Sequence, residues 1–566
     1  MMKKWWMESV GYQIYPKSFF DANHDGIGDL PGILSKLGYL HELGVNLIWI
    51  CPFYDSPMDD NGYDVRDFFK VADIFGDIEH IKAIIREAHQ LGIRVILDLV
   101  LNHTSDEHPW FIESRKSKDN PYRDFYIWHE GRIKHGKKIE PTNWASFFGG
   151  SCWRHDPQTD SYYMKIFSDK MPDLNWENPE VRQAMADVAK WWLDLGVDGF
   201  RIDAVSHLQR DAFVDSTLTD DRYVLDWKKF SNLPKVHDHV RWLHNEVFEP
   251  YDCLTIGETG GEASIEEGLR YASFDAKALS MVFNFDHNWC NNLWSIDDPK
   301  DLKTDVIRLK QVFAQWQEAF KGQGWLPLNW LNHDQPRLMS HYGSRAHFKA
   351  SGKMLATALH MMRGTPFIYQ GEEIGMINHP FENLQDFRDI ASINHYHELM
   401  RKHPDADLAY IIKKVVMTSR DHPRTPVHWD DTRHAGFSTV RPWIDVTPNH
   451  DLINIADQMQ DQDSIWHHYR KLIQLRLTSD LRDVIIHGTF EMIDVAHPSL
   501  YVYKRHHDHD QLLVVNNFTA EHVIWRLPAD RVTAVIIQNY PDVDIRHQTL
   551  YLRPYESIVF KTEAHT

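Results

Sequence analysis

The chain has 566 residues, of which 43% are hydrophobic and 25% charged, an ordinary composition for a globular protein with more than one domain. Its formal net charge of -20 argues against a nucleic-acid partner, because a phosphate backbone requires a basic protein face. No apolar run of about eighteen residues occurs, so we expect no membrane span, and the amino-terminal segment lacks the apolar core of a signal peptide.

Helix-like segments that end in glycine and lead directly into short apolar strands recur along the chain. Three predicted helices end in this way: residues 30–43, 78–91 and 181–195, which precede Gly44, Gly92 and Gly196. Glycine suits the left-handed position that closes a helix, and this alternation is typical of parallel strand–helix units. The predicted strands are residues 10–19, 45–50, 93–100, 199–205, 254–257, 281–285, 326–331 and 366–369. Eight strands that alternate with helices predict an α/β fold, a (β/α)8 TIM barrel.

Two stretches interrupt the alternation. After the third strand, residues 105–175 have no long helical period and predict an inserted subdomain. After the fourth strand, residues 207–240 predict a long charged loop. Short alternating runs from residue 483 to 566 predict a C-terminal antiparallel β domain. We therefore expect the catalytic barrel to comprise residues 1–104 and 176–482.

The segment from Gly199 to Val205 predicts a buried strand that carries one Arg and one Asp among apolar residues. A buried charge is costly unless it is paired. Because Arg201 and Asp203 are two residues apart, they face the same side of the strand, where the guanidinium can keep the carboxylate ionised. A nucleophilic carboxylate needs that state, although this segment alone indicates a structural salt bridge equally well.

Further acidic and polar residues follow later strands, at the end of a barrel where active sites form. Glu258 follows the fifth strand, and Asp334 follows the seventh. Three carboxyl groups at one mouth suit glycoside hydrolysis, in which one is the nucleophile and one the general acid. We expect Asp203 and Asp334 to raise the pKa of Glu258 and so keep it protonated near neutral pH.

Several motifs carry a family resemblance. The segments that resemble the four sequence regions of the alpha-amylase superfamily of retaining glycoside hydrolases are Asp98 to His103, Gly199 to Asp203, Ile256 to Glu258 and Asn332 to Asp334. Those that resemble its oligo-1,6-glucosidase and alpha-glucosidase branch are Asp60 to Asp64, Pro172 to Trp176, Asn332 to Arg337, Gly371 to Met376 and Ser419 to Pro426. The resemblance implies an exo-acting retaining alpha-glucosidase that releases glucose from the non-reducing end of short α-glucosides, with isomaltose, isomalto-oligosaccharides and panose favoured.

The resemblance also implies a role for each matching residue. Asp203 would be the nucleophile, Glu258 the general acid and base, and Asp334 the group that holds two glucose hydroxyls. The implied substrate-binding residues are Asp60, Tyr63, His103, Phe167, Arg201, His333, Arg420 and Arg424. Of these, Asp60 and Arg424 resemble the pair that closes the pocket, whereas Arg420 suits a structural role as well as a substrate-binding one.

The loop from Asp21 to Asp29 carries oxygen-bearing side chains at alternate positions, which a hard cation such as Ca²⁺ prefers. The loop does not continue as an EF-hand, because Gly32 stands where an EF-hand has Glu. It does resemble a calcium-binding loop of the same branch, which implies a structural Ca²⁺, with a metal-free acidic turn as the alternative. The implied ligands are the side chains of Asp21, Asn23, Asp25 and Asp29 and the carbonyl of Ile27. No organic cofactor is expected.

Two positions depart from the oligo-1,6-glucosidase pattern. Ala204 follows the nucleophile, where this branch has Val in α-1,6-cleaving and Thr in α-1,4-preferring enzymes, and Met171 replaces the usual Gln. Three alternatives therefore stay open: an α-1,4-preferring alpha-glucosidase acting on maltose, a trehalose-6-phosphate hydrolase and a glucosyl-transferring sucrose isomerase. The arginine-rich loop associated with the isomerases is absent. A transporter-associated subunit without catalytic acids is disfavoured, because all three acids are present.

The four cysteines are scattered and show no metal-binding or disulfide-rich spacing. We expect reduced thiols, a cytoplasmic location, a small oligosaccharide as the substrate, and a monomer or weak homo-oligomer.

Overall fold

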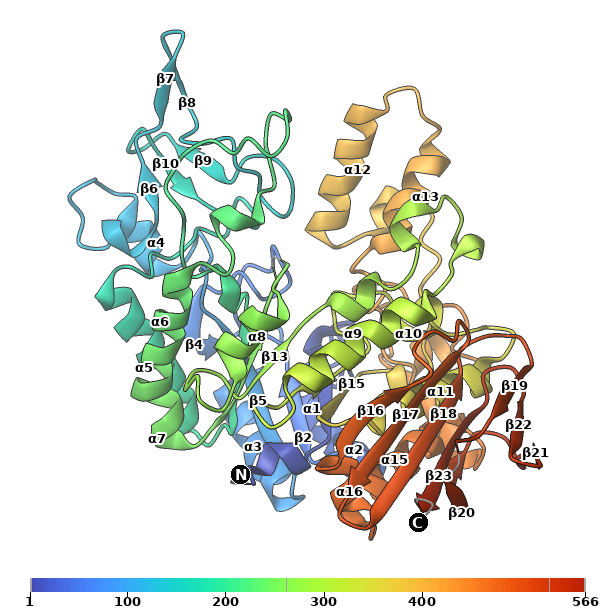
Figure 1. The fold of residues 1–566 in the computed structure, drawn as a ribbon. Coiled ribbons are helices and arrows are strands. Elements are labelled where there is room, and N and C mark those ends of the chain that lie inside the picture. The colour runs from blue at the N-terminus through green and yellow to red at the C-terminus, as the bar shows by residue number, and fades with distance from the viewer. Residues whose placement is uncertain (1–2, 261, 529, 564–566) are drawn as a thin grey trace.

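A computed structural model describes residues 3–260, 262–528 and 530–563. Within these residues, one sheet contains eight parallel strands in the order β13-β12-β11-β5-β2-β1-β15-β14 and curves into a nearly closed barrel (Figure 1). The strands are β1 Gly11–Ile14, β2 Leu47–Ile50, β5 Arg94–Val100, β11 Gly199–Asp203, β12 Leu254–Glu258, β13 Met281–Phe283, β14 Pro327–Leu328 and β15 Thr365–Tyr369. The predicted TIM barrel is confirmed.

Helices surround the barrel and alternate with its strands. They include α1 Leu30–Ser35, α2 Leu37–Leu43, α3 Ile78–Gln90, α5 Pro179–Asp194, α6 Pro234–Leu243, α8 Ile265–Ala272, α9 Val306–Ala319, α11 Phe348–His360 and α15 Ile465–Thr478. Gly44 and Gly196 follow α2 and α5 with φ 103° each, a conformation that glycine adopts without strain. No helix in the described ranges is both long and apolar enough to cross a membrane.

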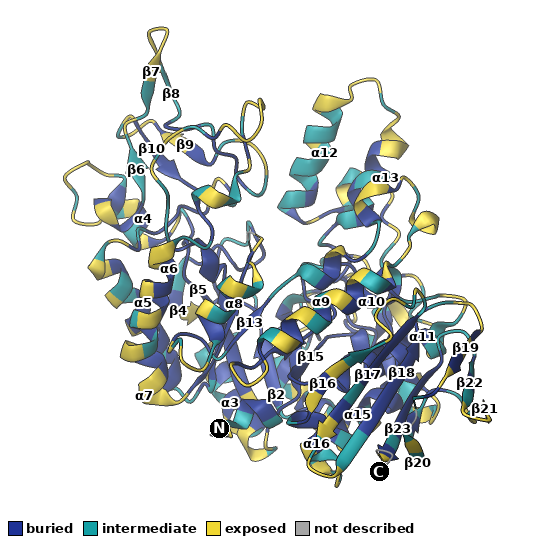
Figure 2. Cartoon of the chain, viewed as in Figure 1, coloured by how far each residue is buried: buried dark blue, intermediate teal, exposed yellow. Residues whose placement is uncertain are grey.

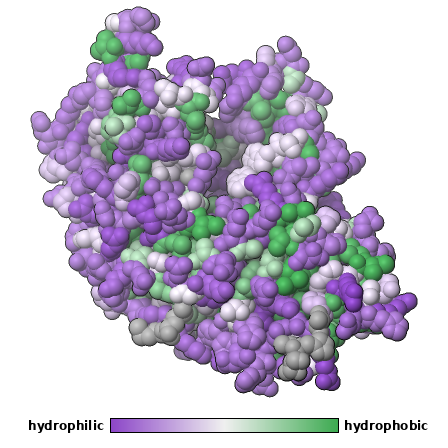
Figure 3. Space-filling model, viewed as in Figure 1, coloured by the Kyte–Doolittle hydropathy of each residue, from purple (hydrophilic) through white to green (hydrophobic). Residues whose placement is uncertain are grey.

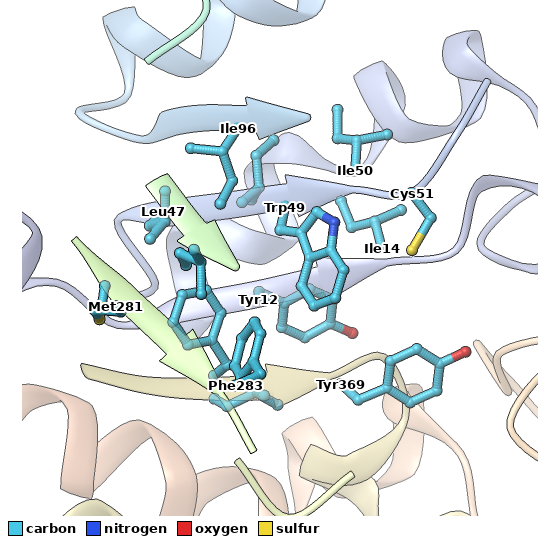
Figure 4. Close-up of a cluster of buried hydrophobic side chains, with 14 of the residues drawn as sticks. Tyr12, Ile14, Leu47, Trp49, Ile50, Cys51, Ile96, Met281, Phe283 and Tyr369 are labelled. Carbon is cyan, nitrogen blue, oxygen red and sulfur yellow. The ribbon is translucent and has the colours of Figure 1, made fainter. Parts of the chain in front are cut away.

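Aromatic and aliphatic side chains fill the barrel interior. Figure 4 shows Tyr12, Trp49 and Phe283 pointing toward one another from β1, β2 and β13. The rings of Trp49 and Phe283 stack with centroids 5.7 Å apart. Such a packed interior leaves the carboxyl end of the strands as the place for polar groups.

Two projections rise from the carboxyl end of the barrel (Figure 1). The insertion arm follows β5 and contains a three-stranded sheet of β6 Trp128–His129, β10 Ser161–Met164 and β9 Trp153–Asp156, and a hairpin of β7 Arg132–Lys134 and β8 Lys137–Ile139. The helical arm follows β15 and contains α12 Ile390–Lys402 and α13 Leu408–Thr418. The sequence predicts the first arm but not the second.

The C-terminal region is all-β, as predicted. A five-stranded antiparallel sheet contains β16 Thr489–Ile493, β17 Leu500–His507, β18 Asp510–Asn517, β23 Ser557–Glu563 and β20 Arg531–Gln538. A smaller sheet contains β19 Val523–Arg526, β22 Thr549–Leu552 and β21 Ile545–Arg546. Figure 2 shows β17 and β18 largely buried, which indicates that one face of the sheet packs on the barrel.

The first predicted strand and helix are shorter in the structure. The strand expected at residues 10–19 ends at Ile14, and a 3-10 turn begins at Pro16, whose ring removes the backbone donor that a longer strand needs. The helix expected at residues 30–43 is divided at Lys36, where the backbone leaves helical geometry.

Two later expectations also change. The loop expected at residues 207–240 contains the start of α6, whose first residue, Pro234, has the fixed φ that suits a first helical turn. The strand expected at residues 326–331 pairs over only Pro327 and Leu328.

Candidate active site

Arg201 lies at the centre of the carboxyl end of the barrel, with a side chain only 1% exposed. Its Nη1 donates to Oδ1 of Asp203 at 2.7 Å, and its Nη2 lies 2.7 Å from Oε2 of Glu258. The two carboxyl groups come from the ends of β11 and β12, which pair side by side. One guanidinium bridges them, and this suits the short separation of about 5–5.5 Å that retaining glycosidases use.

Asp98 on β5 supports this arrangement from below. Its Oδ1 accepts a hydrogen bond from Nη1 of Arg201 at 2.5 Å, and its Oδ2 accepts one from the indole of Trp49 at 2.7 Å. The residue is fully buried. Because both carboxylate oxygens have protein partners, Asp98 holds Arg201 in place and does not face a substrate.

The two bridged carboxyl groups have raised pKa values. Burial raises the pKa of Asp203 to about 6, with Arg201 opposing and Asp98 adding to the shift. Burial also raises the pKa of Glu258 to about 7, where Arg201 lowers it and the charges of Asp203 and Asp334 raise it further. Glu258 therefore keeps its proton at a pH at which Asp203 is ionised. A general acid must be protonated and a nucleophilic carboxylate must be ionised, so these protonation states suit the two roles.

Asp334 has the opposite electrostatic environment. Its Oδ1 accepts from Nη2 of Arg424 at 2.6 Å and from Nη1 of Arg420 at 3.3 Å, and its Oδ2 lies 3.3 Å from Nε2 of His333. Burial alone would raise its pKa, but His333 and the two arginines hold the pKa below the ordinary value. Asp334 is therefore a fixed anion, suited to accept hydrogen bonds from sugar hydroxyls.

Asp60 and the two pocket arginines form one charged network. Oδ1 of Asp60 accepts from Nη2 of Arg420 at 3.0 Å, whereas Arg424 bonds Asp334 instead. Arg420 also donates from Nη2 to Oδ1 of Asp389 at 2.5 Å. Arg420 is thus both a structural residue and a neighbour of the pocket carboxylates, and Asp60 lies within the electrostatic reach of Arg420 and Arg424 alike.

His333 is held in one tautomer by its surroundings. The side-chain amide of Gln13 lies 2.9 Å from Nδ1, so Nδ1 accepts and Nε2 carries the hydrogen toward the pocket. The ring of Tyr63 stacks on His333 with centroids 5.2 Å apart and planes 6° apart. Burial lowers the pKa of His333 to about 3, so the ring is a neutral hydrogen-bond donor.

His103 and Phe167 line the neighbouring wall. Their rings meet edge to face with centroids 5.2 Å apart. Nε2 of His103 is buried and has no hydrogen-bond partner within the ranges that the structure covers. Such an orphaned polar atom beside the catalytic carboxyl groups suits a substrate hydroxyl.

The two arms meet above these residues. The side-chain amide of Asn394 on α12 donates to the carbonyl of Phe148 in the insertion arm at 3.0 Å, and the guanidinium of Arg420 lies 4.8 Å from the Phe148 ring. Figure 3 shows the surface hollowed between the two projections. The contact closes part of this hollow, which favours a pocket over an open groove.

Ala204 has an unusual backbone. It follows Asp203 with φ 46°, in the left-handed region, and its amide donates to Oε2 of Glu258 at 3.2 Å. Its side chain is buried, as is that of Met171. Ala204 therefore helps to position the acid through its backbone amide.

Sequence reasoning missed Gln13, Asp389 and Asn394. Gln13 is a polar residue in the otherwise apolar strand β1, a signal that could have identified it. Asp389 caps α12 and lies far along the chain from its arginine partners, so only the fold brings them together.

The candidate metal loop has oxygen donors that are engaged by its own backbone. Oδ1 of Asp21 accepts from the amide of His24 at 2.7 Å, and Oδ1 of Asp29 accepts from the amide of Gly32 at 2.6 Å. The side chain of Asn23 donates to Asp25 at 3.1 Å. In the described part of the chain, no three or more His, Cys, Asp or Glu side chains gather as metal ligands.

Comparisons with known proteins identify the family of the chain. The family described as "Alpha amylase, catalytic domain" matches residues 13–484, and the "Alpha-amylase SusG C-terminal domain" matches residues 500–559. The chain is 45% identical to an oligo-1,6-glucosidase of Bacillus cereus, over 99% of this chain and all of that protein.

Two solved structures have similar folds over their whole length. A trehalose-6-phosphate hydrolase of Bacillus licheniformis has a TM-score of 0.92 at 39% identity, and covers 99% of this chain and 100% of its own. An isomaltulose synthase variant of Erwinia rhapontici NX5 in complex with sucrose has a TM-score of 0.93 at 34% identity, with 100% of both chains covered. The chain therefore belongs to the alpha-amylase family, and it is a glycoside hydrolase.

Proposed function

We propose that the protein is a retaining, exo-acting alpha-glucosidase that releases glucose from the non-reducing end of short α-glucosides, with α-1,6 links preferred. The observation that carries this proposal is the bridge from Arg201 to both Asp203 and Glu258 at 2.7 Å each. The 45% identity to an oligo-1,6-glucosidase supports the linkage. The contact between Phe148 and Asn394 supports exo-action, because it joins the two arms above the pocket.

The mechanism follows from the charges. An oxygen of Asp203 attacks the anomeric carbon while Glu258 gives its proton to the departing glycosidic oxygen, and a covalent β-glucosyl ester forms. The ester removes the negative charge of Asp203, so the pKa of Glu258 falls and its carboxylate can take a proton from water. As Glu258 takes the proton, the water oxygen attacks the same carbon, the ester bond to Asp203 breaks, and glucose leaves with retained configuration.

The other residues bind and orient the glucose. Asp334 accepts from two hydroxyls, and the neutral His103 and His333 donate to hydroxyls of the same ring. Tyr63 offers its ring face, and Asp60 with Arg420 limits the pocket at the non-reducing end. Phe167 borders the wall next to His103.

The test is a comparison of initial rates of glucose release from isomaltose, maltose, trehalose 6-phosphate and sucrose, with Asp203→Asn as the blank. The fastest release from isomaltose, abolished in the blank, is the expected result. The fastest release from maltose would indicate an α-1,4-preferring alpha-glucosidase, and the fastest release from trehalose 6-phosphate would indicate a trehalose-6-phosphate hydrolase. Activity that survives in Asp203→Asn would overturn the catalytic assignment.

We also propose that the loop from Asp21 to Asp29 binds a structural Ca²⁺. Its donors, from Asp21, Asn23, Asp25, Asp29 and the carbonyl of Ile27, are all oxygen atoms, which suits this ion. Added Ca²⁺ is expected to raise Tm, and Asp25→Asn to reduce that rise. An unchanged Tm with Ca²⁺ and with chelator would contradict the proposal.

A cytoplasmic location and a monomeric or weakly associating state complete the proposal. The cysteines Cys51, Cys152, Cys253 and Cys290 are buried free thiols, which suits a reducing compartment. Gel filtration across a range of concentrations tests the association state.

A further inference from the structure

Two tryptophans lie exposed side by side on the segment that follows β13. Trp289 is 43% exposed and Trp294 is 62% exposed. Their ring centroids are 5.8 Å apart and their planes are tilted by 39°. Single exposed apolar side chains are unremarkable, whereas contiguous exposed apolar surface is typical of interaction sites.

The segment that carries these rings is firmly held. Leu293 and Ile296 are buried against Met417 of the helical arm. The side chain of Lys414 donates to the carbonyl of Ile296 at 2.9 Å. The residues next to the tryptophans therefore point inward, and the rings are exposed by a well-packed backbone, not by a loose loop.

The pair lies on the same face of the barrel as the active site. The segment begins at the carboxyl end of β13, where Phe283 is in register with Glu258 of β12. The amide of Thr259, next to Glu258, donates to the carbonyl of Phe283 at 3.1 Å. The tryptophans thus follow the strand beside the general acid, whose proton goes to the departing sugar chain.

The surroundings suit a carbohydrate. Indole faces pack against the C–H face of a pyranose ring, and two tilted faces suit two successive rings of a bent chain. Neither indole N–H donates a hydrogen bond to any described residue, so both are free to bind a hydroxyl. Three residues after Trp294, the carboxylate of Asp297 accepts a hydrogen bond from the hydroxyl of Tyr410, which is itself 43% exposed.

We propose that Trp289 and Trp294 form a binding platform for the outer glucosyl units of α-glucan chains, outside the catalytic pocket. The choice of ligand rests on the proposed function, because α-glucosides longer than a disaccharide would carry further glucosyl units out of that site. The platform would raise the affinity for long chains and leave the cleavage of a disaccharide unchanged.

The test is affinity electrophoresis in native gels that contain dextran or soluble starch, with Asp203→Asn in every protein so that the polysaccharide stays intact. The two polymers distinguish α-1,6 from α-1,4 chains. We expect Trp289→Ala and Trp294→Ala each to weaken retention about threefold to tenfold, the range of a lost aromatic contact. Trp294→Phe, which keeps a ring, is expected to retain most of the binding.

The matched control is Phe274→Ala. Phe274 is 39% exposed and precedes β13, at the opposite end of the strand from the tryptophans, so its loss should leave retention unchanged. In the active background, the kcat/KM of each variant on isomaltose should equal that of the parent, which also shows that the variants fold.

Three outcomes would overturn the platform: no retardation of the parent in either gel, equal retardation of parent and tryptophan variants, or equal loss in Phe274→Ala. If the parent and the tryptophan variants are retarded equally but differ in apparent size on gel filtration, the tryptophans mediate contacts between copies of the chain. If the enzyme does not cleave isomaltose but its retardation still depends on the tryptophans, the proposed substrate linkage is rejected and the platform is retained.

Discussion

At the scale of single residues, the site is governed by one cation shared among three carboxyl groups. Arg201 bonds Asp98 and Asp203 through Nη1 and contacts Glu258 through Nη2. Burial raises the pKa of each carboxyl group, and the shared guanidinium limits that rise. The protonation state of the pair Asp203 and Glu258 is therefore a property of the cluster, and its apparent pKa values belong to the pair.

This arrangement predicts a bell-shaped dependence of kcat/KM on pH. Activity should fall below a pH of about 6 as Asp203 gains a proton, and above about 7 as Glu258 loses one. In Asp98→Asn, a negative charge that raises the pKa of Asp203 is gone, so the acid limb should move to lower pH. The measurement is a pH profile on isomaltose. An acid limb at the same pH in both proteins would contradict the role of Asp98.

At the scale of elements, the two arms are joined above the pocket by a few contacts. Asn394 on α12 and Phe148 in the insertion arm share one hydrogen bond of 3.0 Å. The base of the same helix is fixed by Asp389, which accepts from the amide of Ser392 and from Arg420. The helical arm is thus tied both to the opposite arm and to the pocket arginine.

We expect Asn394→Ala to raise KM for isomaltose about twofold to tenfold, the usual worth of one hydrogen bond, with little change in kcat. The physical reason is that the hydrogen bond between the two arms is lost while the catalytic carboxyl groups keep their positions. His397→Ala, an exposed position on the same helix, is the control. Equal KM values in Asn394→Ala and the control would contradict a role for the contact.

A second element-scale feature is the buried carboxyl group of Glu372, which accepts a hydrogen bond from Tyr469 of α15 at 2.8 Å. Burial raises its pKa from 4.5 to about 8. Because the folded state binds this proton more tightly than the unfolded state, its contribution to stability is complete below pH 4.5 and is lost as pH rises through about 8.

Glu372→Gln should therefore reduce the loss of Tm between pH 5 and pH 8, because an amide keeps the acceptor for Tyr469 and cannot ionise. Thermal unfolding at several pH values measures the effect. Glu382→Gln, at an exposed position, serves as the control and should follow the parent. An equal decrease in Tm between pH 5 and pH 8 in Glu372→Gln and in the parent would contradict the prediction.

At the scale of the whole molecule, the C-terminal sheet is attached to the barrel by buried cations. Nη2 of Arg505 on β17 donates to the carbonyl of Gly488 at 2.8 Å, and Nη1 donates to the carbonyl of Met361 just after α11. The side chain of Lys310 on α9 donates to the carbonyls of Asp494 and His497 at 2.9 and 2.6 Å. These bonds fix the sheet against the barrel far from the catalytic carboxyl groups.

Arg505→Ala should lower the free energy of unfolding by about 2–5 kcal/mol, because it leaves buried carbonyl groups without donors and opens a cavity. Chemical denaturation measures this loss. The kcat/KM on isomaltose at a temperature where the variant is folded should equal that of the parent. Arg531→Ala, on the exposed edge strand β20, is the control, and an equal loss in both variants would contradict the assigned role.

Features of this protein that depend on local pattern can be predicted from the order of its residues. Alternating helices and strands with closing glycines predicted the barrel, and the spacing of Arg201 and Asp203 on one strand predicted a paired carboxylate. Adjacent strand ends then predicted that Glu258 and Asp334 would join them, because parallel strands bring their carboxyl ends to one face. These features are short-range, so a linear sequence is sufficient to show them.

The contacts between distant groups became visible in the folded chain. It bonded Asp60 to Arg420, brought Asp389 to both arginines, and joined Asn394 to Phe148 across 246 residues of chain. It also placed Trp289 and Trp294 outside the core, whereas the sequence alone favours burial for any single Trp. Such contacts depend on how whole elements pack, and no local pattern of residues encodes them.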